Sequence, residues 1–208
     1  MTTFKKLNRP HHVGSCLLAM IVAVFAWPAD ALAIPVTLNF SGQQLTVVGE
    51  YINAVPVAIG LQEFAPSFQT GQTITASVAY DTIQPDVDPD PNTGTYLIGS
   101  LSVNIPELGL AASRTSNTMQ ISAFNDTASS NDQFFAHVSG VDSFSNTVGL
   151  PNPEFFNVLL FGSLSMLAND QLPTSPLDWT FGNASFAFRA SDGSLRQVLL
   201  SFEPVPAI

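Results

Sequence analysis

Apolar and polar residues alternate along most of this chain, and this period of two limits the folds open to it. In 73–80 the apolar residues take every second position, mostly with threonine or serine between them. The same alternation recurs in 36–40, 100–105, 119–123, 185–189 and 197–202. Successive side chains of a strand point to opposite faces, so each run offers one face to a core and one to water. The pattern is that of antiparallel sheet, not of a parallel sheet buried on both faces.

The remaining segments agree with an all-β chain. Runs 133–140 and 155–161 are apolar on both faces, which indicates more central strands. Ser41-Gly42 separates two alternating runs, and Asp192-Gly193 fits a type I′ hairpin turn. Frequent prolines and glycines leave no helical pattern of a dozen residues. We therefore predict an antiparallel β-sandwich of jelly-roll type.

The first 33 residues have the order of an export signal. Basic residues precede the apolar run 16–27, and Ala31-Leu32-Ala33 provides a small-residue cleavage site. The run is shorter than the roughly 20 residues of a membrane span, although an uncleaved anchor is the alternative. We predict a signal peptide at 1–33, cleaved after Ala33 and using the general secretory route, followed by a single domain at 34–208.

Charge and cysteine content exclude several functions for residues 34–208. This part has three arginines, no lysine and fifteen acidic residues. Binding to nucleic acid or to anionic lipid depends on basic side chains, so neither is expected. It has no cysteine, which excludes disulfides, thiol catalysis and cysteine-based zinc sites. No run of 18 apolar residues follows the signal, so no further membrane span is expected.

The loop between the runs 73–80 and 100–105 is the most distinctive segment. Acidic and amide side chains recur there at every second position: Asp86, Asp88, Asp90 and Asn92. This spacing is similar to that of a calcium loop, but proline stands at position 91 and leucine at 97, where such a loop needs glycine and glutamate. The pattern favours a stiff acidic connector. The alternative is a calcium site completed by another segment, with Asp126 or Asp132 as donors.

Two further residues have candidate roles. His137 is the only histidine after the signal, and no G-x-S-x-G motif accompanies it. A structural role is therefore favoured over a hydrolase, in which His137 or a pair of carboxylates would line a pocket. Trp179 is the best candidate for a sugar-binding platform, which makes a carbohydrate-binding module the second alternative. No catalytic residue is assigned and no cofactor other than calcium is expected.

Several segments give the chain a resemblance to a known family. They are 71–74, 78–82, the Asp/Pro loop, 94–96, 131–134 and 172–177. With these segments the stretch from about 71 to 190 resembles bacterial exported proteins that carry PEP-CTERM sorting signals. The resemblance implies a Gram-negative exported or surface protein, associated with extracellular polysaccharide or biofilm. The family's Val-Pro-Glu-Pro motif, apolar helix and basic cluster do not follow in 203–208. The alternatives are a truncated chain and a member that lacks the anchor, and release is expected rather than anchoring.

The sequence thus leads to a prediction about function without naming a ligand. We predict a non-enzymatic secreted or cell-surface protein of structural or adhesive kind, with extracellular polysaccharide or the cell surface as its partner. The carbohydrate-binding module and the secreted hydrolase are the alternatives.

Overall fold

The strands of this chain form one antiparallel sheet organised around a long first strand, β1 (Pro35–Ile52). In the computed structural model, the described residues are 35–90, 93–97, 99–116, 120–124, 132–163, 166–167, 171–173 and 177–206. They belong to one compact unit, Ala33–Ile208. The predicted signal peptide lies outside the described residues, as does its cleavage site at Ala33.

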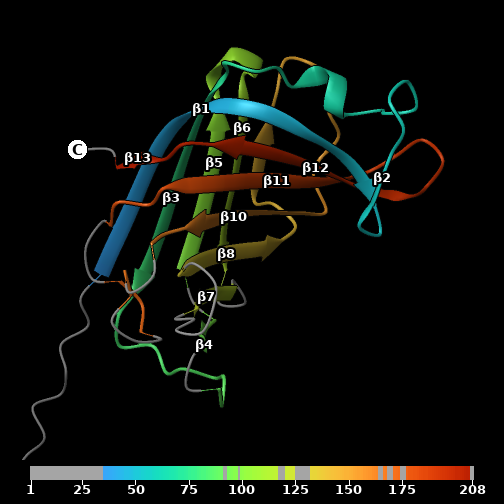
Figure 1. The fold of residues 1–208 in the computed structure, drawn as a ribbon. Coiled ribbons are helices and arrows are strands. Elements are labelled where there is room, and N and C mark those ends of the chain that lie inside the picture. Colours follow the sequence, from blue (N-terminus) through green and yellow to red (C-terminus); the bar gives the residue numbers. More distant parts are fainter. Residues whose placement is uncertain are drawn as a thin grey trace, which may run out of the picture. The chain divides into compact units, whose positions relative to one another are not determined.

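β1 joins the two halves of the sheet. Its first half pairs with β3 (Thr73–Asp81), from Pro35 opposite Asp81 to Gln43 opposite Thr73. Its second half pairs with β12 (Leu195–Phe202), with register shifts on both sides of Thr46–Val47. Figure 1 shows β1 arching from the steeply running strands of the β3 half to the crosswise strands of the β12 half.

The other elements extend the two halves. They are β2 (Val55–Pro56), β4 (Thr93–Tyr96), β5 (Gly99–Ile105), β6 (Leu110–Ser116), β7 (Gln120–Phe124), β8 (Gln133–Ser139), β9 (Ser143–Ser145), β10 (Phe155–Phe161), β11 (Phe181–Arg189), β13 (Val205–Pro206) and the 3₁₀ turns η1 (Ala65–Ser67) and η2 (Pro106–Leu108). The strand order is β4-β7-β8-β10-β11-β12-β1-β3-β5-β6-β9, and β2 and β13 each pair with β1. The sheet is not closed.

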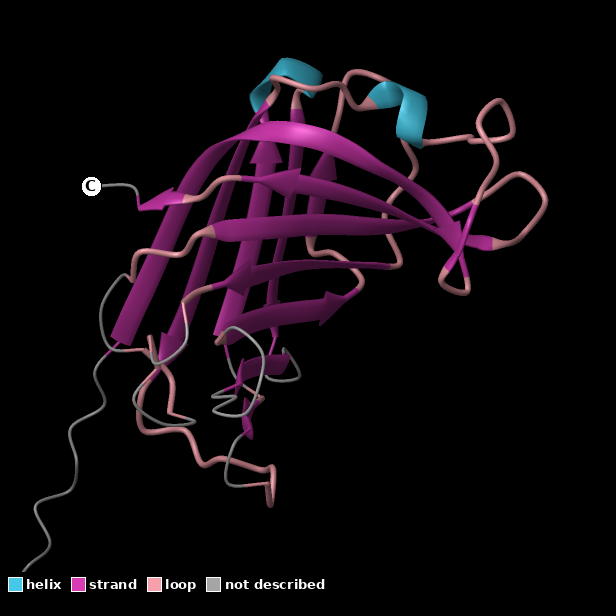
Figure 2. Cartoon of the chain, viewed as in Figure 1, coloured by secondary structure: helices cyan, strands magenta, loops and turns pink. Residues whose placement is uncertain are grey.

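This arrangement confirms the prediction of an all-β antiparallel fold. Figure 2 shows strands throughout, with only the two short 3₁₀ turns among the described residues. β8 and β10, which come from the runs that are apolar on both faces, lie inside the sheet with a neighbour on each side. No helix among the described residues is long and apolar enough to cross a bilayer.

The core is built from the apolar phase of the strands. In β3 every second residue is buried, and the same holds in β5 and β8 over most of their length. The buried cluster takes side chains from both halves of the sheet, for example Leu38 and Val103 from one half and Phe156 and Phe186 from the other. The alternation seen in the sequence therefore describes the buried face of each strand.

The turn predicted at Ser41-Gly42 is wrong, because β1 continues through it. Both residues pair with β3, opposite Thr75 and Ile74. Gly42 serves a close approach: a Cβ there would lie 2.2 Å from the carbonyl oxygen of Glu203. The glycine lets the chain that leaves β12 cross against β1, which a side chain would prevent.

The predicted C-terminal hairpin is present, but its turn is of another type. β11 and β12 pair from Gly182–Phe202 to Arg189–Leu195. Only Gly193 of the turn has a positive φ, 81°, whereas a type I′ turn needs two such residues. The N–H of Gly193 donates to the carbonyl of Ala190, and that of Ala190 to the carbonyl of Ser194. This is a turn followed by a left-handed glycine, and the Asp192 carboxylate stabilises it by accepting from Ser194.

Candidate functional site

The acidic loop uses its carboxylates on its own backbone. Asp86 accepts from the N–H of Asp88 at 2.9 Å and of Thr95 at 2.7 Å. Asp88 accepts in the same way from the N–H of Asp90 at 2.9 Å. Asn92 lies outside the described residues. Among the residues that are described, no group of three or more histidine, cysteine or acidic side chains could hold a metal ion.

Asp132, a helper proposed for the calcium site, is buried near a different segment. Its side chain is 0 % exposed, and one carboxylate oxygen accepts from the N–H of Leu167 at 2.6 Å. The other oxygen has no hydrogen-bond partner within the described chain. Asp126, the second helper, lies outside the described residues.

Trp179 does not provide an exposed platform. Its side chain is 4 % exposed and packs against Phe134, with 6.0 Å between ring centroids. Tyr80 and Tyr96, which flank the acidic loop, are 4 % and 5 % exposed. The Tyr80 hydroxyl donates to the carbonyl of Pro173, and burial raises the pKa of this phenol. These three aromatic residues belong to the core, so the sugar platform cannot be built from them.

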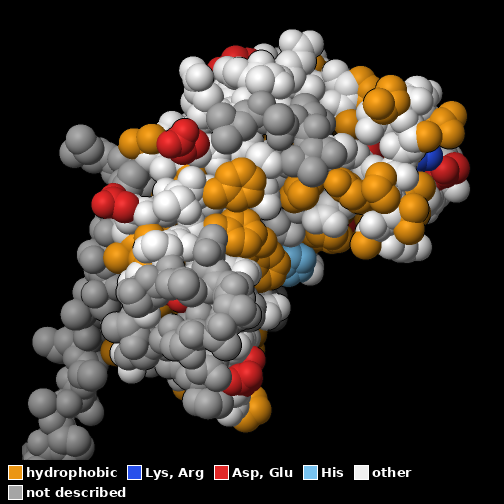
Figure 3. Space-filling view, viewed as in Figure 1, with side chains coloured by type: hydrophobic (Ala, Val, Ile, Leu, Met, Phe, Trp, Pro, Cys, Tyr) orange, Lys and Arg blue, Asp and Glu red, His pale blue; other side chains and the backbone are white. Residues whose placement is uncertain are grey.

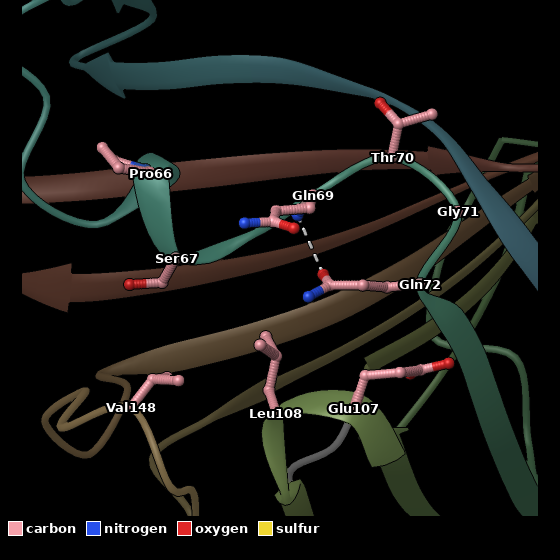
Figure 4. A pocket seen from close by; sticks show the side chains of 9 residues that line it. All are labelled: Pro66, Ser67, Gln69, Thr70, Gly71, Gln72, Glu107, Leu108 and Val148. Carbon is pink, nitrogen blue, oxygen red and sulfur yellow. Dashed lines mark hydrogen bonds between the residues drawn. The ribbon is translucent and has the colours of Figure 1, made fainter.

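A cavity of about 630 Å³ opens beside the 3₁₀ turns η1 and η2 (Figure 4). Segment 66–72 forms one side, and Glu107, Leu108 and Val148 form the other. The side-chain oxygen of Gln72 accepts from the N–H of Gln69 at 2.9 Å, and Glu107 accepts from the N–H of Thr73. The N–H groups of Glu107 itself and of Thr73 lower the pKa of this carboxyl.

The hydrolase alternative predicts that His137, or a pair of carboxylates, lines a pocket. Glu107 is the one carboxylate among the described residues that line it, and His137 lies elsewhere, on β8. Hydrolysis of a glycosidic bond by the usual route needs two carboxylates facing each other. The described lining of this cavity therefore offers one carboxylate where that route uses two.

The most distinctive surface is the outer face of β8, β10, β11 and β12, opposite the core. It carries five partly exposed rings among polar side chains, since the same strand registers also place Gln133, Ser139, Asn183 and Ser201 on it. We call it the aromatic face and define it by its side chains: Phe135, His137, Phe155, Asn157, Leu159, Phe161, Phe181, Ser185, Gln197 and Leu199. The strand registers place them on one side of the sheet, and Figure 3 shows hydrophobic side chains gathered there with a histidine beside them.

The rings of the aromatic face form two groups. His137 lies between Phe135 and Phe155, with centroid distances of 5.8 and 5.3 Å. Phe161 and Phe181 form the second group, with centroids 5.7 Å apart. All five rings are partly exposed. Burial between its neighbours lowers the pKa of His137, so the imidazole is neutral at pH 7.

A polar stripe crosses the aromatic face between the rings. The side-chain nitrogen of Gln197 donates to the Ser185 hydroxyl at 2.8 Å, and Ser185 donates to the side-chain oxygen of Asn157 at 2.9 Å. Ser185 is 0 % exposed because larger side chains on the same face cover it. The chain of donors fixes the orientation of both amides. Asn157 is itself buried, at 8 % exposed, whereas Gln197 is partly exposed, so Gln197 is the amide of this stripe that faces solvent.

Sequence reasoning missed this face, although the signal for it was present. Runs 133–140 and 155–161 were interpreted as central strands because they are apolar on both faces. Both strands are central, but only one of their faces meets the core. The second apolar face is the aromatic face.

No protein-family model, curated protein or solved structure matches this chain.

Proposed function

We propose that this protein is a non-enzymatic extracellular protein of adhesive kind, which binds uncharged polysaccharide through the aromatic face. The observation that carries the proposal is the set of five partly exposed rings on one face of the sheet, together with the partly exposed amide of Gln197, which its hydrogen bond to Ser185 orients. Aromatic faces pack against the apolar C–H surface of sugar rings, and fixed polar groups select the pattern of sugar hydroxyls. The aromatic face presents both rings for stacking and oriented polar groups for hydrogen bonding on one rigid sheet.

The charges of the protein support an uncharged polymer over an anionic one. Each of the three arginines in 34–208 is already paired with a carboxylate: Arg114 with Asp142, Arg189 with Glu154, and Arg196 with both Glu50 and Asp192. His137 is neutral at pH 7. The acidic chain therefore offers no uncompensated cation to a carboxylated or sulfated polymer.

The proposed place of action is outside the cell, at the surface or in the surrounding matrix. The export-signal pattern of residues 1–33 supports this location. The resemblance to PEP-CTERM-type exported proteins supports polysaccharide as the partner, and membership of that family is part of the proposal.

Affinity electrophoresis tests the proposal, using gels that contain either neutral glucans and mannans or an anionic alginate. We expect retardation by at least one neutral polymer and none by alginate. Phe155→Ala should weaken retention about tenfold, the equivalent of one aromatic contact of about 1.4 kcal/mol. Gln197→Ala should weaken it through loss of the oriented, partly exposed amide.

The matched control is Gln69→Ala, which alters the cavity in Figure 4 and leaves the aromatic face intact. Circular dichroism verifies that each variant is folded. If Gln69→Ala loses retention in the polysaccharide gels and Phe155→Ala keeps it, the binding site would be assigned to the cavity and not to the aromatic face. Absence of retention by every neutral polymer would refute the proposal.

We also propose that the two halves of the sheet pack face to face as a sandwich, of the jelly-roll-like kind expected from the sequence. Ring contacts between strands that are not neighbours support this packing. Tyr80 of β3 lies 6.1 Å from Phe134 of β8, and Phe144 of β9 lies 6.5 Å from Phe188 of β11, between ring centroids. A double-mutant cycle on the second pair tests the packing, because absence of coupling would contradict it.

A further inference from the structure

The loop that follows β1 exposes apolar side chains far more than any function described so far requires. Residues 53–61 read NAVPVAIGL, without a charged side chain. Val55 is 65 % exposed, Ile59 96 % and Leu61 72 %. We call residues 53–61 the apolar tip. Figure 1 shows it projecting beyond the end of the sheet at β2, and Figure 3 shows hydrophobic side chains at that end.

The apolar tip is held in one conformation with these side chains outward. Asn53 and Ala54 both have positive φ, 50° and 64°, and make the tight turn that pairs Ile52 with Val55. The N–H of Val57 donates to the carbonyl of Glu50 at 2.7 Å. These contacts stop the first half of the tip from folding back onto the core.

The second half of the tip is fixed from the neighbouring hairpin. The N–H of Leu61 donates to the carbonyl of Ala58 at 2.9 Å, and the Leu61 carbonyl accepts from the Arg196 guanidinium at 3.0 Å. These backbone groups of the tip, and those of β2 that pair with β1, are therefore already hydrogen-bonded within the protein. This matters for an apolar environment, where an unpaired backbone group is costly.

A lipid surface fits these features better than a protein partner. A specific protein interface buries about 800 Å² on each side, which needs a broad complementary patch rather than a projecting loop of nine residues. A lipid layer requires no matching shape, only apolar side chains and few charges. Asp192 lies beside the tip, since it pairs with the same Arg196 that holds Leu61, and the whole chain carries a net charge of −10. Anionic lipid headgroups would be repelled.

We propose that the apolar tip inserts shallowly into an uncharged lipid surface and so attaches the protein to a membrane. Ile59 is the leading side chain, and Val55 and Leu61 enter beside it. The attachment is reversible, because three aliphatic side chains bury little area compared with a membrane span. The proposal is independent of polysaccharide binding, since the aromatic face and the apolar tip share no residue.

Sedimentation with phosphatidylcholine vesicles tests this, using protein purified after export so that every variant has the same N-terminus. Wild type should co-sediment with these vesicles, and less with vesicles containing phosphatidylglycerol at low salt. Ile59→Asp should weaken partitioning at least about tenfold, since it replaces an inserted aliphatic side chain with a charge. Val205→Asp is the matched control, because Val205 is 62 % exposed in β13, outside the tip.

Three results would overturn the proposal: no co-sedimentation of the wild type, equal loss in Val205→Asp, or a dimer in analytical ultracentrifugation that Ile59→Asp dissociates while vesicles stay unbound. The last would assign the tip to a second copy of the chain. The fully exposed position of Ile59 means that the melting temperature should not change, and its measurement excludes unfolding. Phe155→Ala should keep vesicle binding, which separates this proposal from the polysaccharide site.

Discussion

Glu50 is the residue on which the loop after β1 depends. Its carboxylate is 0 % exposed and accepts from three consecutive backbone N–H groups, those of Glu63, Phe64 and Ala65, at 2.7–3.0 Å. It also pairs with Arg196 at 3.0 Å. Burial by itself would raise the pKa of Glu50, but the three N–H groups and the guanidinium outweigh it and lower the pKa. The carboxylate thereby fastens the end of the loop to β1.

Replacing this carboxylate should be costly. Glu50→Gln removes the buried one of the two carboxylates that compensate a largely buried guanidinium, and we expect a loss of about 3 kcal/mol in the free energy of unfolding, measured in urea. Because the folded pKa is lowered, the contribution is fully present above the ordinary value of 4.5 and disappears as pH falls through the folded pKa. The difference in the free energy of unfolding between wild type and Glu50→Gln should therefore become smaller as the pH falls.

Glu154→Gln is the matched control for this experiment. Glu154 also pairs with an arginine, Arg189, but the two side chains are 46 % and 58 % exposed. Exposed ion pairs contribute about 0–1 kcal/mol, so the variant should unfold close to the wild type. Two results would contradict the role assigned to Glu50. One is a loss in the free energy of unfolding for Glu50→Gln that is no larger than the loss for Glu154→Gln. The other is a difference between wild type and Glu50→Gln that does not change with pH.

At the level of elements, the acidic loop covers an edge of the sheet. β4 is the last strand at one edge, and its Thr95 has both backbone groups occupied: the N–H donates to Asp86 and the carbonyl accepts from Val87. An uncovered edge strand invites pairing with another chain. The loop thus has a structural role in protecting this edge, with its carboxylates oriented toward its own backbone.

The close approach of the segment after β12 to Gly42 of β1 leads to a second prediction about the elements. Gly42→Ala places a Cβ 2.2 Å from the Glu203 carbonyl oxygen and 2.9 Å from the Phe202 ring, so the backbone has to move. We expect a loss of about 1–3 kcal/mol in the free energy of unfolding, as for other overpacked sites. Gln43→Ala, at an exposed position of the same strand, should change it by less than about 0.5 kcal/mol. Equal effects of the two substitutions would contradict the close approach.

At the scale of the molecule, the sequence predicted the strands well and their assembly poorly. Period two located nearly every long strand, because alternation follows directly from the geometry of a strand. It could not show that β1 runs through Ser41-Gly42, because these residues pair with β3 and the glycine serves a close approach to Glu203 at the far end of the sequence. The aromatic face was missed for a similar reason: apolar residues on both faces of β8 and β10 do not reveal which face meets the core. The burial of Trp179 likewise depends on Phe134, a partner distant in sequence.

The packing of the two halves is testable at the same scale. If β9 and β11 face each other across the core, Phe144→Ala and Phe188→Ala should not be additive. The coupling in a double-mutant cycle should be about 0.5–1.5 kcal/mol, the range for aromatic pairs. A second double-mutant cycle, on Phe144 and Phe161, is the control. Phe161 packs against Phe181 and not against Phe144, so the effects of these two substitutions should be additive.

The sharing of β1 between the halves has a consequence for how the protein folds. The second half of β1 has β12 as its long partner, and β12 is made almost last. A chain made in order from its N-terminus therefore carries a half-paired first strand until nearly all of it has been synthesised. Pairings so distant in sequence slow folding and leave an apolar edge open to other chains in the meantime. Folding of this protein is thus expected to finish only when nearly the whole chain is available, with aggregation as its main competitor.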